Sequence, residues 1–233
     1  MSSSPHISRR LAVLVSFALL CGVRGPEGAG ASSGRQAPFY EGMFPALTSR
    51  YAADLQRSVD AGQRRWLLNP ALVGESFARF IQWPARPGSG RVVSRHGSRA
   101  VIRIDRYDTR HIPLYVDVAR LGRQRGGIWS VTDCHTANMR IIRPVSGTRV
   151  STPLPVHGVA NVFEGSFLLV VLNERWEPVG RKRMQVQGQQ LAQFSTRVPF
   201  HSRGSYAILK MFSGSAKDGK LERVVMVKVA LGS

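Results

Sequence analysis

The sequence predicts a small α+β domain followed by an all-β, immunoglobulin-like sandwich of about seven strands. Residues 153–165 read P-L-P-V-H-G-V-A-N-V-F-E-G, and their apolar positions recur with the period of two that a strand with one buried face requires. Similar short segments recur along residues 139–233, separated by turns with glycine or proline, which is typical of a sandwich. Residues 47–137 begin instead with helical periodicity and change to alternation after Gly88, as expected for helices packed on a sheet.

The first 31 residues have the order of a secretory signal peptide. Arg9-Arg10 precede an apolar run at residues 11–23, and Ala29-Gly30-Ala31 supply the small residues of a cleavage site. The apolar run is shorter than the roughly 20 residues that a membrane-spanning helix needs. We therefore expect export to the cell envelope or the extracellular space. Membrane attachment through a lipid on Cys21 stays open, although Leu20 departs from the small residue that a lipoprotein signal places there.

Residues 32–46 contain glycine, serine and proline, and we expect them to form a tether. Residues 47–61 have helical periodicity. A second helix is expected to begin at Asn69-Pro70, because asparagine is a favoured N-cap and proline suits the first helical position. One face of this second helix holds the apolar residues Val73, Phe77, Phe80 and Ile81.

Alternating segments at residues 92–93, 102–104, 114–118 and 128–131 predict about four antiparallel strands, which complete the domain at 47–137. A linker at residues 134–138 is expected to join this domain to the sandwich. Once the leader is removed, Cys134 has no partner for an internal disulfide, so it is either buried or paired between chains.

The candidate strands of the sandwich lie at residues 139–143, 154–161, 167–173, 179–187, 191–198, 206–212 and 223–231. Residues 167–172 are apolar on both faces, so the outer face is expected to dock the α+β domain or a second subunit, or else to lie under a long loop. Gly204-Ser205-Tyr206 fits a tyrosine corner, which places Ile208 where antibody domains hold their second cysteine. Lys210 has the same parity as Ile208, so either this placement requires a bulge or it is wrong.

Three motifs together resemble a known family. They are I-I-R-P-V-S-G-T-R-V at residues 141–150, the stretch at 153–165, and S-A-K-D-G at 215–219. Residues 139–233 thereby resemble the immunoglobulin-like domain of bacterial spore germination proteins. The resemblance implies an exported bacterial envelope module that binds or scaffolds other components, and it implies no catalytic residues. The companion domain usual in that family is not visible in residues 47–137.

The chain is strongly basic. It has 33 Lys and Arg residues against 14 Asp and Glu residues, a net charge of +19, and 28 of the 33 cations are arginine. Part of this excess is typical of a GC-rich genome, and the remainder favours attraction to anionic wall polymers or acidic envelope proteins. Aromatic residues make up only 8% and do not interleave with the basic ones as a nucleic-acid groove requires, so we expect no nucleic-acid partner.

Two loops of the sandwich are the candidate binding site. In the immunoglobulin strand order, the loop between the second and third strands and the loop between the last two strands lie at the same end. The side chains that would meet there are Asn161, Phe163, Glu164, Lys217 and Asp218. Alternatively, these residues only stabilise the loops: Glu164 pairs with Lys217, Asn161 caps its own turn, and Phe163 fills the end of the sandwich.

Catalytic motifs are absent from the sequence, which has no H-E-x-x-H, C-x-x-C, Walker or G-x-S-x-G pattern. We therefore expect no catalytic residue, no cofactor and no metal. His157 has the parity of a solvent-facing residue. The carboxylates that would serve a hydrolase are Asp105, Asp108, Asp117 and Asp133.

The leading hypothesis is an exported, non-enzymatic bacterial envelope protein that binds another envelope component through its immunoglobulin-like domain. The alternative is an extracytoplasmic hydrolase with its chemistry in residues 47–137 and the sandwich as a targeting module. A pocket in that half with two converging titratable residues would favour the alternative.

Overall fold

Helices α1 (Ser49–Asp60) and α2 (Pro70–Phe80) form where the sequence predicts them, joined by the short 3-10 helix η1 (Arg65–Leu68). The Thr48 hydroxyl accepts a hydrogen bond from the amide of Tyr51 at 3.2 Å, and Asn69 Oδ1 accepts one from the amide of Ala71 at 3.0 Å. These bonds satisfy amide groups that the first turn of a helix leaves without partners. The N-cap predicted at Asn69 is confirmed.

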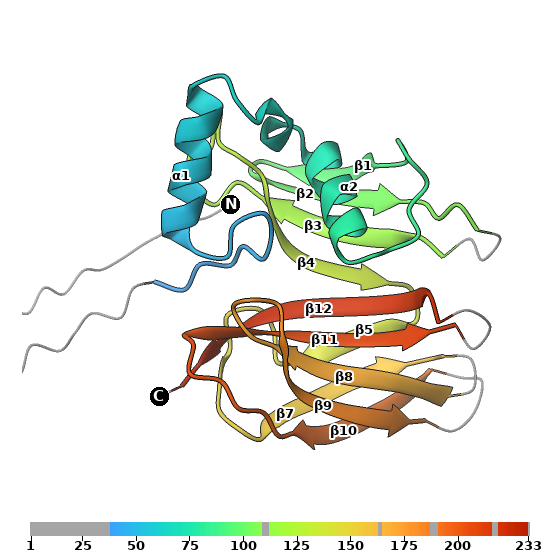
Figure 1. The fold of residues 1–233 in the computed structure, drawn as a ribbon. Coiled ribbons are helices and arrows are strands. Elements are labelled where there is room, and N and C mark those ends of the chain that lie inside the picture. Colours follow the sequence, from blue (N-terminus) through green and yellow to red (C-terminus); the bar gives the residue numbers. More distant parts are fainter. Residues whose placement is uncertain (1–37, 109–111, 163–164, 187–190, 216–218, 233) are drawn as a thin grey trace, which may run out of the picture. The chain divides into compact units, whose positions relative to one another are not determined.

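The structure, a computed structural model, describes residues 38–108, 112–162, 165–186, 191–215 and 219–232, and residues 38–233 belong to one compact unit (Figure 1). The expected signal peptide at 1–31 and the tether up to residue 37 lie outside the described residues. The strands are β1 (Arg91–His96), β2 (Arg99–Ile104), β3 (Leu114–Ala119), β4 (Ser130–Thr136), β5 (Met139–Arg143), β6 (Arg149–Val150), β7 (Leu154–Ala160), β8 (Ser166–Leu172), β9 (Pro178–Gln185), β10 (Ala192–Val198), β11 (Tyr206–Gly214) and β12 (Leu221–Leu231).

One large sheet runs through both halves of the described chain. Its strand order is β1-β2-β3-β4-β12-β11-β8-β9, and β6 pairs with β12 in addition. Strand β12 pairs with β11 on one side and with β4 on the other, where Met226 is the register partner of Cys134. Residues 134–136 are therefore part of β4, and Asn138 has a positive φ of 64° between β4 and β5. The prediction of a linker at 134–138 is wrong, because residues 134–136 belong to β4 and β4 pairs with β12 in the same sheet.

A three-stranded sheet, β10-β7-β5, lies against the β8–β11–β12 part of the large sheet and makes the predicted immunoglobulin-like sandwich (Figure 1). The helices cover the opposite face of the large sheet, with α2 against β2 and β3. Strand β11 consequently lies between two cores: Leu209 is buried in the sandwich core and Ile208 in the core under the helices. The placement of Ile208 at the position of the second cysteine is wrong, because Leu209 and Met211 face the sandwich core and Ile208 points to the other side of the sheet.

The apolar strand at residues 167–172 is explained in the same way. Leu169 and Val171 face the sandwich core, whereas Leu172 and the half-buried Val170 pack against the core under the helices. Of the interpretations left open, docking of the N-terminal half therefore accounts for Leu172 and for the covered part of Val170, whereas Leu168 is half-buried and lies outside that core. Cys134 is fully buried in the same core under the helices, the first of its two expected fates.

Phe80 departs from the expected helix face. Val73, Phe77 and Ile81 are buried, but Phe80 is 47% exposed. Its ring meets the edge of Trp176, from the loop between β8 and β9, with the ring centres 4.7 Å apart. This aromatic contact joins the C-terminal end of α2 to the sandwich.

Residues 38–46, where the sequence predicts the end of a tether, are instead packed onto the large sheet. Met43 is buried, and its amide donates to the Val131 carbonyl at 2.7 Å. The ammonium of Lys228, on β12, donates to the carbonyl oxygens of Tyr40, Gly42 and Leu47 at 2.7, 2.9 and 2.6 Å. A buried ammonium needs such acceptors, so this lysine holds the segment in place.

Candidate functional site

Most of the predicted loop site lies outside the described residues. Four of its five residues are among those not described, and their proximity stays a prediction: Phe163, Glu164, Lys217 and Asp218. Asn161 is described: it follows β7, and its amide donates to the Asn138 carbonyl at 2.8 Å. Gly165 in this loop has a positive φ of 67°, whereas Asn161 does not.

The strands that carry the two loops do end side by side. Leu168 near the start of β8 is the register partner of Phe212 near the end of β11. The bases of both loops therefore lie at one end of the sandwich, as the immunoglobulin order implies.

Next to the base of the β11–β12 loop lies a cavity of about 580 Å³, which we call the junction pocket. It is bounded by the C-terminal end of α2 and the turn after it on one side and by the β11–β12 hairpin on the other. Its described lining residues are Arg79, Ile81, Gln82, Trp83, Pro84, Tyr107, Lys210, Phe212, Gly214, Gly219, Lys220 and Leu221. Three of these twelve are cations, and none carries a carboxylate.

Each lysine of the junction pocket lies over an aromatic ring. Lys210 Nζ is 4.7 Å from the centre of the Phe212 ring, and Lys220 Nζ is 5.9 Å from that of Tyr107. Burial lowers the pKa of Lys210 below its ordinary value, and no carboxylate within the described residues pairs with it. A partly buried ammonium without a counter-ion attracts an anion, because an anion would restore the lost solvation.

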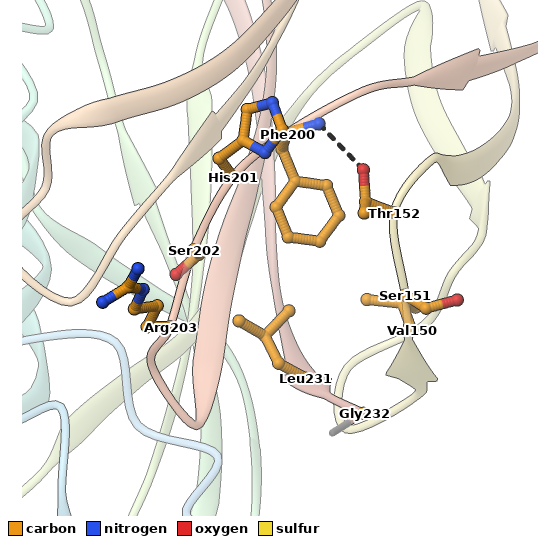
Figure 2. A pocket seen from close by; sticks show the side chains of 9 residues that line it. All are labelled: Val150, Ser151, Thr152, Phe200, His201, Ser202, Arg203, Leu231 and Gly232. Atoms are coloured by element: carbon orange, nitrogen blue, oxygen red, sulfur yellow. Dashed lines mark hydrogen bonds between the residues drawn. The ribbon is translucent and has the colours of Figure 1, made fainter.

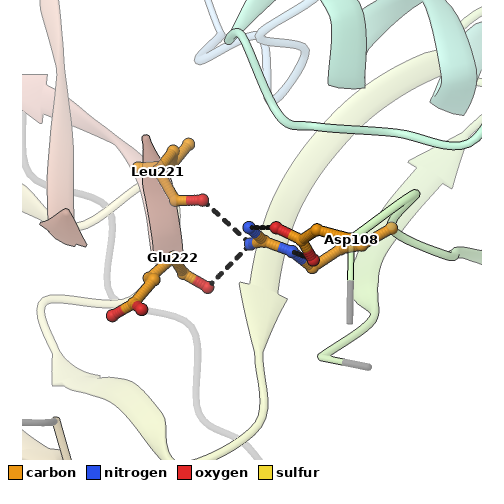
Figure 3. A network of polar contacts seen from close by, with 4 residues as sticks. Asp108, Leu221 and Glu222 are labelled. Atoms are coloured by element: carbon orange, nitrogen blue, oxygen red, sulfur yellow. Dashed lines mark hydrogen bonds and ion pairs between the residues drawn. The ribbon is translucent and has the colours of Figure 1, made fainter. Parts of the chain in front are cut away.

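Arg106 holds the walls of the junction pocket together. Its guanidinium is fully buried and stacks 4.6 Å from the centre of the Trp83 ring. It binds the carboxylate of Asp108 at 2.7 and 2.5 Å, and it donates to the carbonyl oxygens of Leu221 and Glu222 at 2.8 and 3.3 Å (Figure 3). One side chain thus ties the turn after α2 to the start of β12 and orients the pocket without lining it.

We expect Arg106→Met to lower the free energy of unfolding by about 3 kcal/mol, because it removes the hydrogen bonds that the buried guanidinium donates to the Asp108 carboxylate and to two carbonyl oxygens. Chemical denaturation measures this loss. The exposed Arg103, which pairs with Asp105 two residues later in the chain, supplies the control: Arg103→Met should cost less than about 1 kcal/mol. Equal losses in the two variants would contradict the role given to Arg106.

A second cavity, of about 570 Å³, lies at the opposite end of the sandwich, beside residue 232 (Figure 2). Phe200 and Leu231 form its apolar part, and His201, Ser202 and Arg203 form one wall. The hydroxyl of Thr152 accepts a hydrogen bond from the Phe200 amide at 3.1 Å and joins the other wall to it. With one arginine in place of three cations, this cavity is the weaker candidate for an anion.

Comparison with known families agrees with the sandwich. Residues 138–220 are similar to the immunoglobulin-like domain of bacterial spore germination. The match begins just before β5 and ends at Lys220, which lines the junction pocket. The curated proteins and the solved structures gave no match. The resemblance predicted from the three motifs is confirmed.

The matched segment, residues 138–220, contributes Lys210, Phe212 and Lys220 to the junction pocket, whereas Arg79 and Trp83 come from the N-terminal half. Sequence reasoning missed this site. The available signal was Lys210, a charged residue on the parity of the buried Ile208 within an apolar strand. That signal could not name the surface that faces Lys210, because the surface comes from residues more than 100 positions earlier.

Of the four carboxylates proposed for a hydrolase, two are neighbours on the sheet face away from the helices. Asp117 on β3 is the register partner of Asp133 on β4, and Asp117 Oδ2 is 3.6 Å from His135 Nδ1. Burial raises the pKa of Asp133 to about 7, and the charge of Asp117 adds to this effect. The cavity at this face measures only about 70 Å³ and includes Asp117 but not Asp133.

Asp105 and Asp108 are paired with Arg103 and Arg106. His157 is exposed, as its parity predicts. Among the described residues, no group of three His, Cys, Asp or Glu side chains is placed to hold a metal ion. In the same part of the chain, none of the helices has the length and apolar character to span a membrane.

Proposed function

We propose that this protein is an exported, non-enzymatic envelope module that binds an anionic envelope component in the junction pocket. The observation that carries the proposal is the lining of the pocket: it holds Arg79, Lys210 and Lys220, each lysine lies over an aromatic ring, and none of the described lining residues carries a carboxylate. A cationic side chain beside apolar surface attracts an anion more strongly than a fully exposed one does. The nearby protein displaces water, which would otherwise screen the attraction between the two charges.

Two further observations support the proposal. The germination-type immunoglobulin-like domain supplies the scaffold, and loops and hairpins on such scaffolds commonly carry binding residues. Residues 1–31 have the basic, apolar and small-residue segments of a signal peptide, which favours export. Export would bring the pocket to anionic wall polymers or acidic envelope proteins. The net charge of +19 would speed the encounter with either partner.

The test uses residues 32–233 and a synthetic poly(glycerol phosphate) as the anionic probe. We expect saturable binding that weakens as salt rises, and the double variant Lys210→Gln/Lys220→Gln should bind about 10-fold or more weakly. The measurement is titration by calorimetry, with the tryptophan fluorescence as a second signal.

Arg140→Gln/Arg143→Gln is the matched control. Both arginines are exposed on β5, in the other sheet, so this variant loses the same charge and should bind like the parent protein. Equal weakening in the two double variants would show that net charge alone attracts the probe, and the pocket would then not be the site.

The hydrolase alternative has one observation in its favour, the coupling of Asp117 and Asp133. A proton held near pH 7 suits a general acid. Hydrolysis of a wall polymer that Asp133→Asn abolishes, while the folded state persists, would replace the binding proposal.

A further inference from the structure

Strand β9 presents two arginines on the face of the sheet that also holds the floor of the junction pocket. Arg181 is the register partner of Val170 on β8, and Val170 is the partner of Lys210 on β11. In the next row, Arg183 is the partner of Leu168, and Leu168 is the partner of Phe212. Because register partners project from the same side of a sheet, the two rows share one face.

The rows connect the pocket to the edge of the sheet. Neighbouring strands lie about 4.8 Å apart, so Arg181 is two strands, or about 10 Å, from Lys210 at the backbone. Between them lie the half-buried side chains of Val170 and Leu168. An apolar strip thus has cations at both ends: Lys210 in the pocket, and the exposed Arg181 and Arg183 at the edge.

Charges on an edge strand also prevent the edge from pairing with another chain. A charge protects the edge equally well on either face of β9. Lys182, between the two arginines, is directed to the other face and donates to the Arg197 carbonyl at 3.2 Å. Substitution of Lys182 therefore tests edge protection alone, whereas substitution of Arg181 and Arg183 tests edge protection and ligand binding together.

We infer that the ligand is a linear polyanion that begins in the junction pocket and crosses β11, β8 and β9, so that a second negative charge along the chain reaches Arg181 and Arg183. This inference rests on the proposed function and deepens it. A single small anion would occupy the pocket alone, whereas charge-binding groups about 10 Å apart fit repeated charges on one chain. Phosphodiester and polyuronate chains share this chemistry.

The experiment measures dissociation constants for glycerol 3-phosphate, for poly(glycerol phosphate) of increasing length and for oligogalacturonates of matched length. For the parent protein, affinity should rise at least 10-fold once the chain is long enough to span the two cationic groups. Arg181→Gln/Arg183→Gln should remove this gain and leave the affinity for glycerol 3-phosphate unchanged. Lys210→Gln/Lys220→Gln should weaken all probes. The better of the two polymer series identifies the chain chemistry.

Lys182→Gln is the control on the same strand and should keep the full gain with length. If affinity does not rise with length, or if the arginine variant keeps the gain, the track across β8 and β9 is overturned while the pocket stands. If neither monomer nor polymer binds the parent protein, the proposed function itself fails. If all three β9 substitutions cause self-association in sedimentation and none changes binding, edge protection accounts for the charges and the inference is wrong.

Discussion

Replacement of Lys228 with methionine is expected to lower the free energy of unfolding by about 3 kcal/mol. Lys228 is 1% exposed, and its ammonium donates to three carbonyl oxygens of residues 40–47 at 2.6 to 2.9 Å. Methionine keeps the length and apolar stem of the side chain but donates no hydrogen bond. The three carbonyls would be left without their partner, each at a cost of about 1 kcal/mol or more.

One effect opposes this loss. Burial lowers the pKa of Lys228 to about 7, so the buried ammonium itself costs free energy at neutral pH. Three unsatisfied acceptors together outweigh that cost, and the ammonium is also 4.0 Å from the centre of the Tyr206 ring. The net result is a destabilised variant.

Urea denaturation at pH 7 measures the change, and amide hydrogen exchange in residues 38–47 locates it. Exchange there should accelerate, because Lys228 holds this segment against β12. The exposed Lys182 is the matched control, and Lys182→Met should change stability by less than about 0.5 kcal/mol. A Lys228→Met protein as stable as the parent would show that the three carbonyls find other partners.

Stability should fall as pH rises from about 4 to 7, and Asp133 is the cause. Burial first, and then the charge of Asp117, raise the pKa of Asp133 from 3.8 to about 7. Between these values the folded protein holds a proton that the unfolded chain releases. The stabilisation is therefore full below pH 3.8 and is lost as pH rises to 7, at a cost of about 4 kcal/mol.

Asp133→Asn should abolish this slope and stabilise the protein at pH 8 by about 2 kcal/mol, since a neutral amide replaces a partly buried carboxylate. Denaturation midpoints from pH 4 to 8 provide the measurement. Asp117→Asn should reduce the slope without abolishing it, because burial is the larger cause. Lys228 acts in a separate window: its lowered pKa makes stability rise from pH 7 to 10.5. An unchanged slope in Asp133→Asn would refute the assignment.

Local patterns predicted most of the secondary structure. The strand expected at 139–143 coincides with β5, and the Asn69-Pro70 pair marks the start of α2. These predictions succeed because caps and alternation depend on neighbouring residues and the solvent. The face of Phe80 was predicted wrongly, since its exposure depends on Trp176, a residue of the other half of the chain.

The candidate site was far less accessible from the sequence. Its cations are Arg79, Lys210 and Lys220, and their positions in the sequence form no recognisable motif. Arg106 joins the two walls of the pocket, because it stacks on Trp83 after α2 and donates to carbonyl oxygens at the start of β12. Contacts across more than 100 residues leave no local pattern, so sequence reasoning favoured the loops at 161–165 and 215–220 instead.

Short segments of the chain were enough to predict the sandwich, its family resemblance, both helices and the basic character, because periodicity, turn residues and charge are local properties. The pairing of β12 with β4 could be found only from the folded protein. That one pairing turns two predicted domains into a continuous sheet, buries β11 on both faces and gives Lys228 and Cys134 their surroundings. Strand pairing between distant segments depends on which apolar faces meet in space, and alternation along one strand does not encode its neighbour.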